Sequence, residues 1–510
     1  MTNPECKRDS IRPVDWAVLA ALSVCVLLPI WIVRYPAAQD YWNHLLKAKI
    51  VADYGDAGLG YSRFYRILLL PIPNISSTLV MALAMKLFAP MTAGKLFLSA
   101  YALGLPLAAR YLVRSAGVHC RPLHYIGFAL VYNPCFWGGY IDLCMSAAIA
   151  LLAVGHWLRI GVNPPPRSCA ACLALALLTY LTHFWGFALL IVVTGLLAIG
   201  ESSRKRALWV GCTVLCGIML AAYARGTSER LSAGYYGASY TLSMVRNFLS
   251  MPRLAGQEAD GAHLASAATL IVIRLSLLGV LTAEAVRQRS RMLWVAAILV
   301  ALYVALPNQL GRMYEPGQRT LVFVPVILSA AVITRSSART ARALWALVIG
   351  CALLPALFAA RSWRAKDADL AAYHDALRRI PSGSSVLHVI TVDAPPLEWP
   401  AKLLGSDAYR PEAFFGAVYN VEKGGFYLHT FTTGLVRVRD GASPVRPWFI
   451  MDSGFEWPRW LKSNMDMLRR SYEYVVVAGP RRRVDRVLTP DYERVLRRGE
   501  IELLANRGKI

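Results

Sequence analysis

The order of hydrophobic and polar positions divides the chain into two parts near residue 360. The first part consists of apolar runs separated by short polar stretches, and most runs approach the length of about 20 residues that a membrane-spanning helix needs. The candidate runs are 14–34, 75–89, 93–113, 122–137, 139–158, 168–182, 184–200, 207–224, 265–285, 292–306, 320–334 and 342–360. The pattern predicts a multispan membrane domain over residues 1–360 and a separate domain, with the mixed composition of a water-exposed protein, over residues 361–510.

The predicted C-terminal domain contains both strand and helix patterns. Segments 385–393 and 472–478 are rich in β-branched and aromatic residues, which is typical of buried strands, and residues 492–510 contain two further short strands. Segment 365–379 has apolar residues at helical spacing and ends before Pro381, which stops a helix. The tail has neither a glycine-rich phosphate loop nor His/Cys metal spacing, so we expect a small α/β domain for binding or support.

Composition supports this division of the chain. Charged residues make up only 17% of the sequence, whereas soluble domains carry about a quarter, and the mean hydropathy is +0.42. These values exclude a disordered chain, a collagen-like chain, a small disulfide-bonded scaffold and a single soluble domain. All ten cysteines precede residue 352, and most lie in apolar runs, where cysteine acts as a small hydrophobic residue. Cys169 and Cys172 lack a strand–helix–strand context, so no redox or metal site is predicted there.

The excess basic charge is gathered in short clusters between apolar runs. The chain has 55 lysine and arginine residues against 31 aspartate and glutamate residues, which gives a net charge of +24. Clusters of this kind mark the cytoplasmic loops of membrane proteins. They lack the interleaved aromatic residues of a single-stranded nucleic-acid groove, so no nucleic-acid partner is expected. The clusters occupy 114–121, 159–167, 203–206, 287–291 and 335–342.

The same clusters determine which apolar runs cross the membrane. Two runs separate each consecutive pair of clusters, but three runs lie between the basic N-terminus and the cluster at 114–121, where an even number must cross. The run 75–89 is short, contains Lys86 and follows a proline-broken stretch, so we expect it to be an outer interfacial or re-entrant helix. The expected fold class is a polytopic α-helical membrane protein with about eleven spans, this interfacial helix and a C-terminal extracytoplasmic α/β domain.

Ionisable residues at the outer membrane boundary are the candidate functional groups, because charge there is costly unless it is paired or used. Asp40 follows the first span, and His44 lies one helical turn later on the same predicted helix face. Two interpretations are open: Asp40 caps the helix among aromatic anchors, or it is a carboxylate that acts with His44 on a lipid headgroup. Asp53 and Asp56 occupy the same outer loop, in a setting typical of a solvated turn.

Three further residues lie where predicted spans meet the outer face. Asp142 begins a span after a Gly-Gly turn, His183 ends a span, and Arg319 begins one. Taken singly, Asp142 and His183 are compatible with structural caps or interfacial residues. Arg319 either extends toward any phospholipid or holds a specific lipid phosphate with its planar fork. Arg274 is placed deeper in its span and must find a partner or a wet cavity.

The opening of the chain resembles that of the GT-C glycosyltransferase superfamily, whose members are multispan enzymes that use polyprenyl-phosphate sugars. Asp40 lies in the first outer loop and is followed by amphipathic outer segments, which is the opening pattern of this superfamily. The sequence Tyr132-Asn133-Pro134, followed by Asp142, is similar to the Pro … Asp element at the second outer loop of the family.

The later part of the membrane domain carries the same resemblance. His183 falls at a span end where many relatives have a basic residue, although this chain has histidine in place of lysine or arginine. Arg319, followed by Pro325, looks like the Arg-Tyr-x-x-Pro span start of the family, whose arginine is implicated in holding the donor phosphate. The match covers roughly residues 10–360, and an outer C-terminal α/β domain is also common in relatives.

The resemblance implies a sugar transferase on the outer face of a bacterial cytoplasmic membrane, with its N-terminus inside and a polyprenyl-phosphate sugar as donor. Asp40 would be the catalytic base or would orient the acceptor, and Asp142 would be the second carboxylate. His44, His183 and Arg319 would contact substrate, with Arg319 and His183 stabilising the charge of the departing phosphate. The acceptor, whether glycan, lipid or protein, is not specified. The first loop has no Asp-x-Asp or Glu-x-Asp pair, so a divalent metal stays open and no metal ligand is assigned.

Two other functions compete with sugar transfer. A lipid or oligosaccharide flippase or transporter should show internal repeats and ionisable residues near the midplane of the membrane. The chain has no clear repeat, and apart from Arg274 its candidate ionisable residues lie at one face. The third interpretation is a catalytically inactive protein that takes part in assembling a cell-envelope polysaccharide machine.

Overall fold

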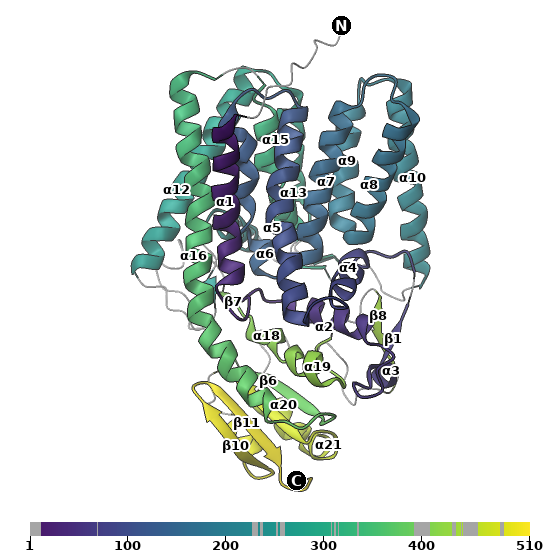
Figure 1. The fold of residues 1–510 in the computed structure, drawn as a ribbon, viewed down its shortest axis with the longest axis vertical. Helices are drawn as coiled ribbons and strands as arrows, with labels where there is room; N and C mark the ends of the chain where they lie inside the picture. The colour runs from purple at the N-terminus through teal and green to yellow at the C-terminus, as the bar shows by residue number, and fades with distance from the viewer. Residues whose placement is uncertain are drawn as a thin grey trace.

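A bundle of long helices is joined at one end to a smaller domain of strands and short helices (Figure 1). This arrangement comes from a computed structural model. It describes residues 12–509 apart from 69, 227–232, 235–237, 251–252, 255–260, 308, 311–312, 315, 334–335, 392–407, 431–434, 440, 442–456 and 480–483.

The bundle contains the long apolar helices that the hydrophobic pattern predicts. Five described helices are long and apolar enough to span a membrane: α1 (Pro13–Trp31), α5 (Pro90–Ser115), α7 (Ile141–Arg159), α12 (Gly261–Arg287) and α16 (Ala338–Arg378). The other bundle helices are α8 (Pro166–Thr182), α9 (Phe184–Ala198), α10 (Ser203–Gly226), α13 (Arg291–Ala305), α14 (Pro316–Leu321) and α15 (Val324–Ala330). The chain is a multi-pass membrane protein, as predicted, while the number of spans stays a prediction.

Short elements connect these helices. They are α2 (Tyr41–Ala52), α3 (Tyr61–Phe64), α11 (Ala238–Leu249), and the strands β1 (Tyr65–Ile67), β2 (Ala233–Gly234), β3 (Arg253–Leu254), β4 (Gln309–Leu310) and β5 (Met313–Tyr314). Of these, α2 is the element that carries two of the predicted site residues, and it begins only ten residues after α1 ends.

The predicted span over residues 122–137 is not an α-helix. It consists of the 3-10 helix η1 (Arg121–Leu130) and the short helix α6 (Pro134–Trp137). Two hydroxyls place it along α1: Tyr125 donates to the Asp15 carbonyl oxygen at 3.1 Å, and Tyr132 donates to that of Val26 at 2.7 Å. Irregular backbone is tolerated at membrane depth where neighbouring helices cover it, and eight of the ten η1 residues are buried. The segment therefore still follows α1 from its start toward its end.

The run over 75–89, predicted not to cross, forms the nine-residue helix α4 (Ser76–Ala84). A helix of this length covers about 14 Å, less than half of the bilayer's apolar thickness of about 30 Å. One face of α4 packs on α2, whereas Leu79, Val80 and Leu83 are exposed. The length of α4 and its exposed apolar face agree with the predicted interfacial helix.

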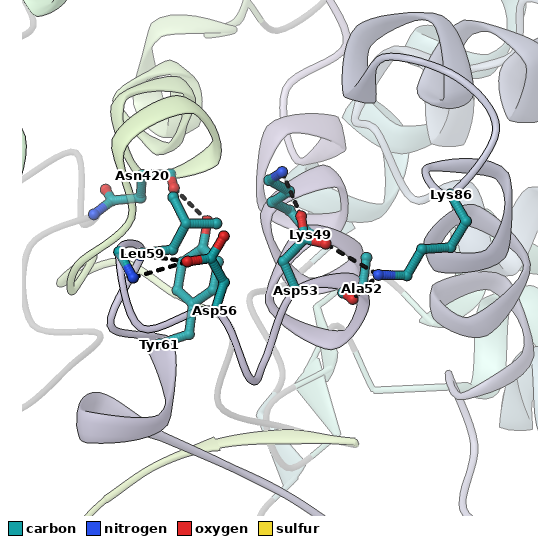
Figure 2. Close-up of polar contacts among 9 residues, drawn as sticks. Lys49, Ala52, Asp53, Asp56, Leu59, Tyr61, Lys86 and Asn420 are labelled. Carbon is teal, nitrogen blue, oxygen red and sulfur yellow. Dashed lines mark hydrogen bonds and ion pairs between the residues drawn. The ribbon is translucent and has the colours of Figure 1, made fainter.

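An ion-pair network ties the end of α2 to the segment after α4 (Figure 2). Asp53 accepts from Lys49 at 2.5 Å and from Lys86 at 3.1 Å, and Lys86 also donates to the carbonyl oxygen of the last α2 residue. Asp53 lies in a turn, as predicted, with 26% of its side chain exposed, and in addition it pairs with both lysines. Asp56 fits the prediction, since its carboxylate accepts from the Gly58 backbone within an exposed turn at 2.8 Å.

The C-terminal domain is built on a mixed four-stranded sheet with the order β10-β11-β9-β6. The strands are β6 (Val386–Ile390), β9 (Tyr474–Ala478), β10 (Tyr492–Arg498) and β11 (Ile501–Asn506). β6 and β9 run parallel, and the other two pairs are antiparallel. Each predicted strand is present, although residues 392 and 393 of the first lie outside the described residues. The two terminal strands turn at Gly499, where φ is +54°.

Short elements complete this domain and link it to the bundle. They are β7 (Ala408–Tyr409), α18 (Glu412–Phe415), α19 (Ala417–Lys423), β8 (Val436–Val438), α20 (Trp457–Ser463), α21 (Met465–Ser471) and α22 (Asp485–Leu488). Helix α16 runs without a break through residue 360 and includes nearly all of the predicted helix over 365–379. The division into units 1–360 and 361–510 stays a prediction.

The C-terminal domain packs directly on α2 and on the segment that follows it. β1 pairs antiparallel with β8. Asn43 of α2 donates to the His429 carbonyl oxygen at 2.6 Å, and the Trp42 ring meets that of Phe415 edge to face at 4.8 Å. Helix α2 therefore lies between the bundle and the C-terminal domain (Figure 1).

Two buried histidines lie beside this contact. His388 Nδ1 is 3.0 Å from the Tyr373 hydroxyl, and the Tyr427 ring packs on both histidine rings with centroids 5.3 and 5.4 Å away. Burial lowers the pKa of His388 to about 3 and that of His429 to about 4. Both side chains are therefore neutral in the folded protein at neutral pH.

We expect the C-terminal domain to lose stability as the pH falls from 6.5 toward 4. The unfolded chain binds protons at the ordinary histidine pKa, whereas the folded chain does not, so each histidine contributes a slope of about 1.4 kcal/mol per pH unit in this window. Thermal unfolding of the purified protein at several pH values measures the slope. A variant with His388→Gln and His429→Gln should show a shallower slope, and an unchanged slope would contradict the assignment.

We also expect the two ends of the bundle to lie on opposite sides of the membrane. Ser203→Cys lies in a predicted cytoplasmic loop and Ser382→Cys in the predicted outer domain, and both positions are exposed. A membrane-impermeant maleimide applied to intact cells should label Ser382→Cys but not Ser203→Cys, above the background of the unmodified chain. Labelling of both positions from one side would overturn the predicted topology.

Candidate active site

Asp40 occupies the N-cap position of α2 but does not cap it. A capping aspartate accepts a hydrogen bond from the backbone of the second or third helical residue. Asp40 makes no such side-chain bond, and its carboxylate is only half-buried. The interpretation of Asp40 as a helix cap is therefore not supported, although the residue lies where a cap would.

The turn before α7 determines where Asp40 lies. The Asp40 backbone N–H donates to the Gly138 carbonyl oxygen at 3.0 Å, and the Gln39 backbone N–H donates to the Trp137 carbonyl oxygen at 3.1 Å. Gly139 has a φ of +75°, and a Cβ at this residue would lie 2.4 Å from the Asp40 nitrogen. Glycine alone permits both the conformation and this approach. The starts of α2 and α7 are held together by backbone contacts.

His44 and Asp142 meet across this junction. His44 Nδ1 lies 3.4 Å from an Asp142 carboxylate oxygen, and their side chains are 10% and 3% exposed. Lys47, one turn further along α2, is also buried and interacts electrostatically with Asp142. Burial lowers the pKa of His44 well below its ordinary value, and the charge of Lys47 lowers it further. Burial likewise lowers the pKa of Lys47, and the Asp142 carboxylate opposes that effect.

Lys47 is the site residue that the sequence analysis missed. Positions 40, 44 and 47 are four and three residues apart, so they share one face of a helix. This spacing was the feature of the sequence from which Lys47 could have been found. A lysine in an outer loop does not stand out in sequence, because most such lysines are solvated, and only the packing of α2 shows that this one is buried.

His183 and Arg319 meet where α8 ends and α14 lies beside it. His183 Nδ1 accepts from the Trp185 backbone N–H at 3.0 Å, so the proton of the neutral ring is on Nε2. Arg319 Nη1 lies 3.3 Å from that Nε2, and its guanidinium stacks over the Tyr140 ring at 4.7 Å. Both nitrogens carry N–H groups, so two donors lie side by side here. A lipid phosphate bound beside them would find two donors.

The turn between α6 and α7 brings all five predicted site residues together. Carbonyl oxygens of this turn accept hydrogen bonds from the start of α2, and the turn leads directly into α7, which carries Asp142. The ring of Tyr140 in the turn supports the guanidinium of Arg319 from α14. The residues gathered in this way are Asp40, His44, Asp142, His183 and Arg319.

No protein-family model matches the chain, and no curated protein matches its sequence. The crystal structure of ArnT from Cupriavidus metallidurans bound to undecaprenyl phosphate matches with a TM-score of 0.55 at 13% identity, over 98% of this chain and 99% of ArnT. The apo structure of the same ArnT matches with a TM-score of 0.54 at 12% identity, over 97% and 98%. The chain has an ArnT-like fold. The predicted resemblance is confirmed at the level of the fold.

Arg274 lies outside this site in the ArnT-like bundle. Its guanidinium donates to the carbonyl oxygens of Phe248, at the end of α11, and of Ser250, the latter at 3.3 Å. These bonds supply the partner that an arginine deep in a span was expected to need. Arg274 holds the end of α11 against α12.

The described residues contain no group of three or more His, Cys, Asp or Glu side chains that could hold a metal ion. Cys169 and Cys172 are free thiols, with no disulfide between them. The titratable side chains described at the junction of α2 and α7 are Asp40, His44, Lys47 and Asp142.

Proposed function

We propose that this chain is a GT-C-type glycosyltransferase that moves a sugar from a polyprenyl-phosphate donor to a cell-envelope acceptor. The reaction takes place on the outer face of the bacterial cytoplasmic membrane. The observation that carries the proposal is the contact of two N–H donor residues, His183 and Arg319, near the buried His44–Asp142 pair within an ArnT-like fold. ArnT was crystallised with undecaprenyl phosphate, a lipid phosphate of the kind that two such donors suit.

The phosphate end of the donor is the leaving group in this proposal. As the bond between the sugar carbon and the phosphate oxygen breaks, negative charge develops on the phosphate. Arg319 and the Nε2–H of His183 are placed to stabilise that charge, and fixed donors act more strongly in a site from which water is largely excluded. The stacking on Tyr140 holds the guanidinium in place before the reaction begins.

Asp40 is the proposed base. It takes the proton of the acceptor hydroxyl while the hydroxyl oxygen bonds to the sugar carbon and the phosphate leaves, so a single displacement inverts that carbon. Support comes from its position at the start of α2, where its backbone bonds to Gly138 in the turn that leads into Asp142. Asp142 is the second carboxylate, and Lys47 with neutral His44 compensates its burial.

The outer leaflet supplies the lipid donor in this proposal. Helix α4 exposes Leu79, Val80 and Leu83 on the side that does not pack on α2. An exposed apolar face on a helix too short to span is the form of an interfacial helix, which lies at the boundary between headgroups and acyl chains. The site on α2 is therefore adjacent to a surface that contacts lipid.

We expect Asp40→Asn to lower the turnover of sugar transfer by about 10²–10⁴-fold, the range that general-base catalysis contributes, with membrane abundance unchanged. Asparagine caps helices as well as aspartate does, so near-wild-type activity would reduce Asp40 to a structural residue. The measurement is radiolabel transfer from undecaprenyl-phosphate sugars into native membranes. Asp56→Asn is the control, because asparagine can still accept from the Gly58 backbone and activity should be retained.

We expect Arg319→Ala to raise the donor KM by about 10- to 150-fold, which corresponds to the loss of charge-assisted hydrogen bonds worth about 1.5–3 kcal/mol. Arg319→Lys keeps the charge but loses the planar fork, so its KM should rise less. Steady-state kinetics at varied donor concentration separates KM from turnover. Arg63→Lys, at an exposed position of α3, is the matched control. An unchanged donor KM in Arg319→Ala would leave Arg319 as an interfacial anchor.

A further inference from the structure

Two buried side chains flank the His183–Arg319 pair and have no hydrogen-bond partner in the described part of the chain. Trp185 follows His183 by two positions in α9, and Gln318 directly precedes Arg319 in α14. The Trp185 indole N–H and both polar atoms of the Gln318 amide are unpartnered, and the two residues are 6% and 1% exposed. Helix α14 packs against α9, so both residues belong to one part of the bundle.

Unpartnered groups of this kind are costly. A buried donor or acceptor left without a partner costs about 1–3 kcal/mol, and most buried polar atoms in proteins are satisfied. Leucine or methionine at 318 and phenylalanine at 185 would fill similar space without this cost. The polar atoms therefore indicate a ligand that satisfies them when it is bound.

We propose that Trp185 and Gln318 form the subsite for the sugar of the donor. This inference rests on the proposed transferase function and deepens it. A sugar offers hydroxyls that both donate and accept, together with a C–H face. The amide matches the hydroxyls with a donor and an acceptor, and the indole matches them with one donor and an aromatic surface. The polyprenyl tail has no polar group and satisfies neither residue.

Recognition of the donor is then divided between two neighbouring sets of residues. Consecutive helical residues point about 100° apart, so Gln318 and Arg319 reach different parts of one bound molecule. Arg319 and His183 bind the phosphate, which every polyprenyl-phosphate donor shares. Trp185 and Gln318 contact the sugar, which differs between donors, and so determine which donor is used.

The test uses variants that remove polar atoms and preserve volume, Trp185→Phe and Gln318→Met. Trp185→Phe should weaken binding of a sugar-linked lipid by about three- to tenfold, as expected for one lost hydrogen bond, and Gln318→Met, which removes a donor and an acceptor, by at least as much. Both variants should leave binding of sugar-free undecaprenyl phosphate unchanged. The thermal stability of the ligand-free protein should stay the same or rise, because no existing bond is lost. Arg319→Ala should weaken binding of both lipids.

Trp209→Phe is the matched control. The Trp209 indole donates to the Ile191 carbonyl oxygen at 3.0 Å, so this change removes a real hydrogen bond away from the site. It should lower the thermal stability and leave the preference between lipids unchanged. If Trp185 and Gln318 were purely structural or bonded to ordered water, their variants would behave like this control: they would lose thermal stability and keep the preference between lipids.

The probes are undecaprenyl phosphate and the same lipid linked to glucose or to arabinose, bound to the purified full-length chain. Loss of the preference for a sugar-linked lipid in both site variants supports the subsite. A preference retained in both variants, or a wild type that binds all three lipids equally, overturns it and leaves the transferase proposal standing. A wild type that binds none of the lipids overturns the transferase proposal, and the subsite with it.

Discussion

The backbone contact between the start of α2 and the turn before α7 is the constraint on which the candidate site depends. Gly139 has no Cβ, so the Asp40 nitrogen can approach it, and the neighbouring carbonyl oxygens accept from the α2 backbone. Once this contact is made, the direction of α2 is set. His44 then reaches Asp142 one turn later, and Lys47 is buried on the same face. A side chain at residue 139 would separate the two helices and the residues they carry.

The C-terminal domain stabilises this arrangement from the other side. An isolated helix of 12 residues is marginal in water, so α2 depends on packing for its stability. The domain supplies it through the Asn43–His429 bond and the contact of Trp42 with Phe415. The lysine pairs of Asp53 hold the far end of the helix (Figure 2). The domain thus provides packing contacts that support α2.

The charges at the site fall into two groups with different chemistry. Around Asp142, a buried carboxylate is balanced by a lysine and a neutral histidine, which leaves little net charge. Around Arg319, the N–H donors of Arg319 and His183 lie side by side with the Tyr140 ring beneath the guanidinium, an environment that favours an anion. The proposed sugar transfer would use both environments, one for the attacking hydroxyl and one for the departing phosphate. The start of α7 joins them, because Tyr140 supports the second group and Asp142 belongs to the first.

Local pattern in the sequence determined the apolar helices, the short helix after the proline-broken stretch, the strands of the C-terminal domain and the shared face of Asp40 and His44. These features depend on residues that are neighbours along the chain, so length and periodicity suffice to predict them. The tertiary structure decided the rest: the 3-10 form of 121–130, the pairing of Asp53 with Lys86, the burial of Lys47 and the approach of Arg319 to His183. Each of these depends on a partner distant in sequence. Whether a charge is solvated, paired or buried is set by what packs against it, and spacing along the chain does not encode that.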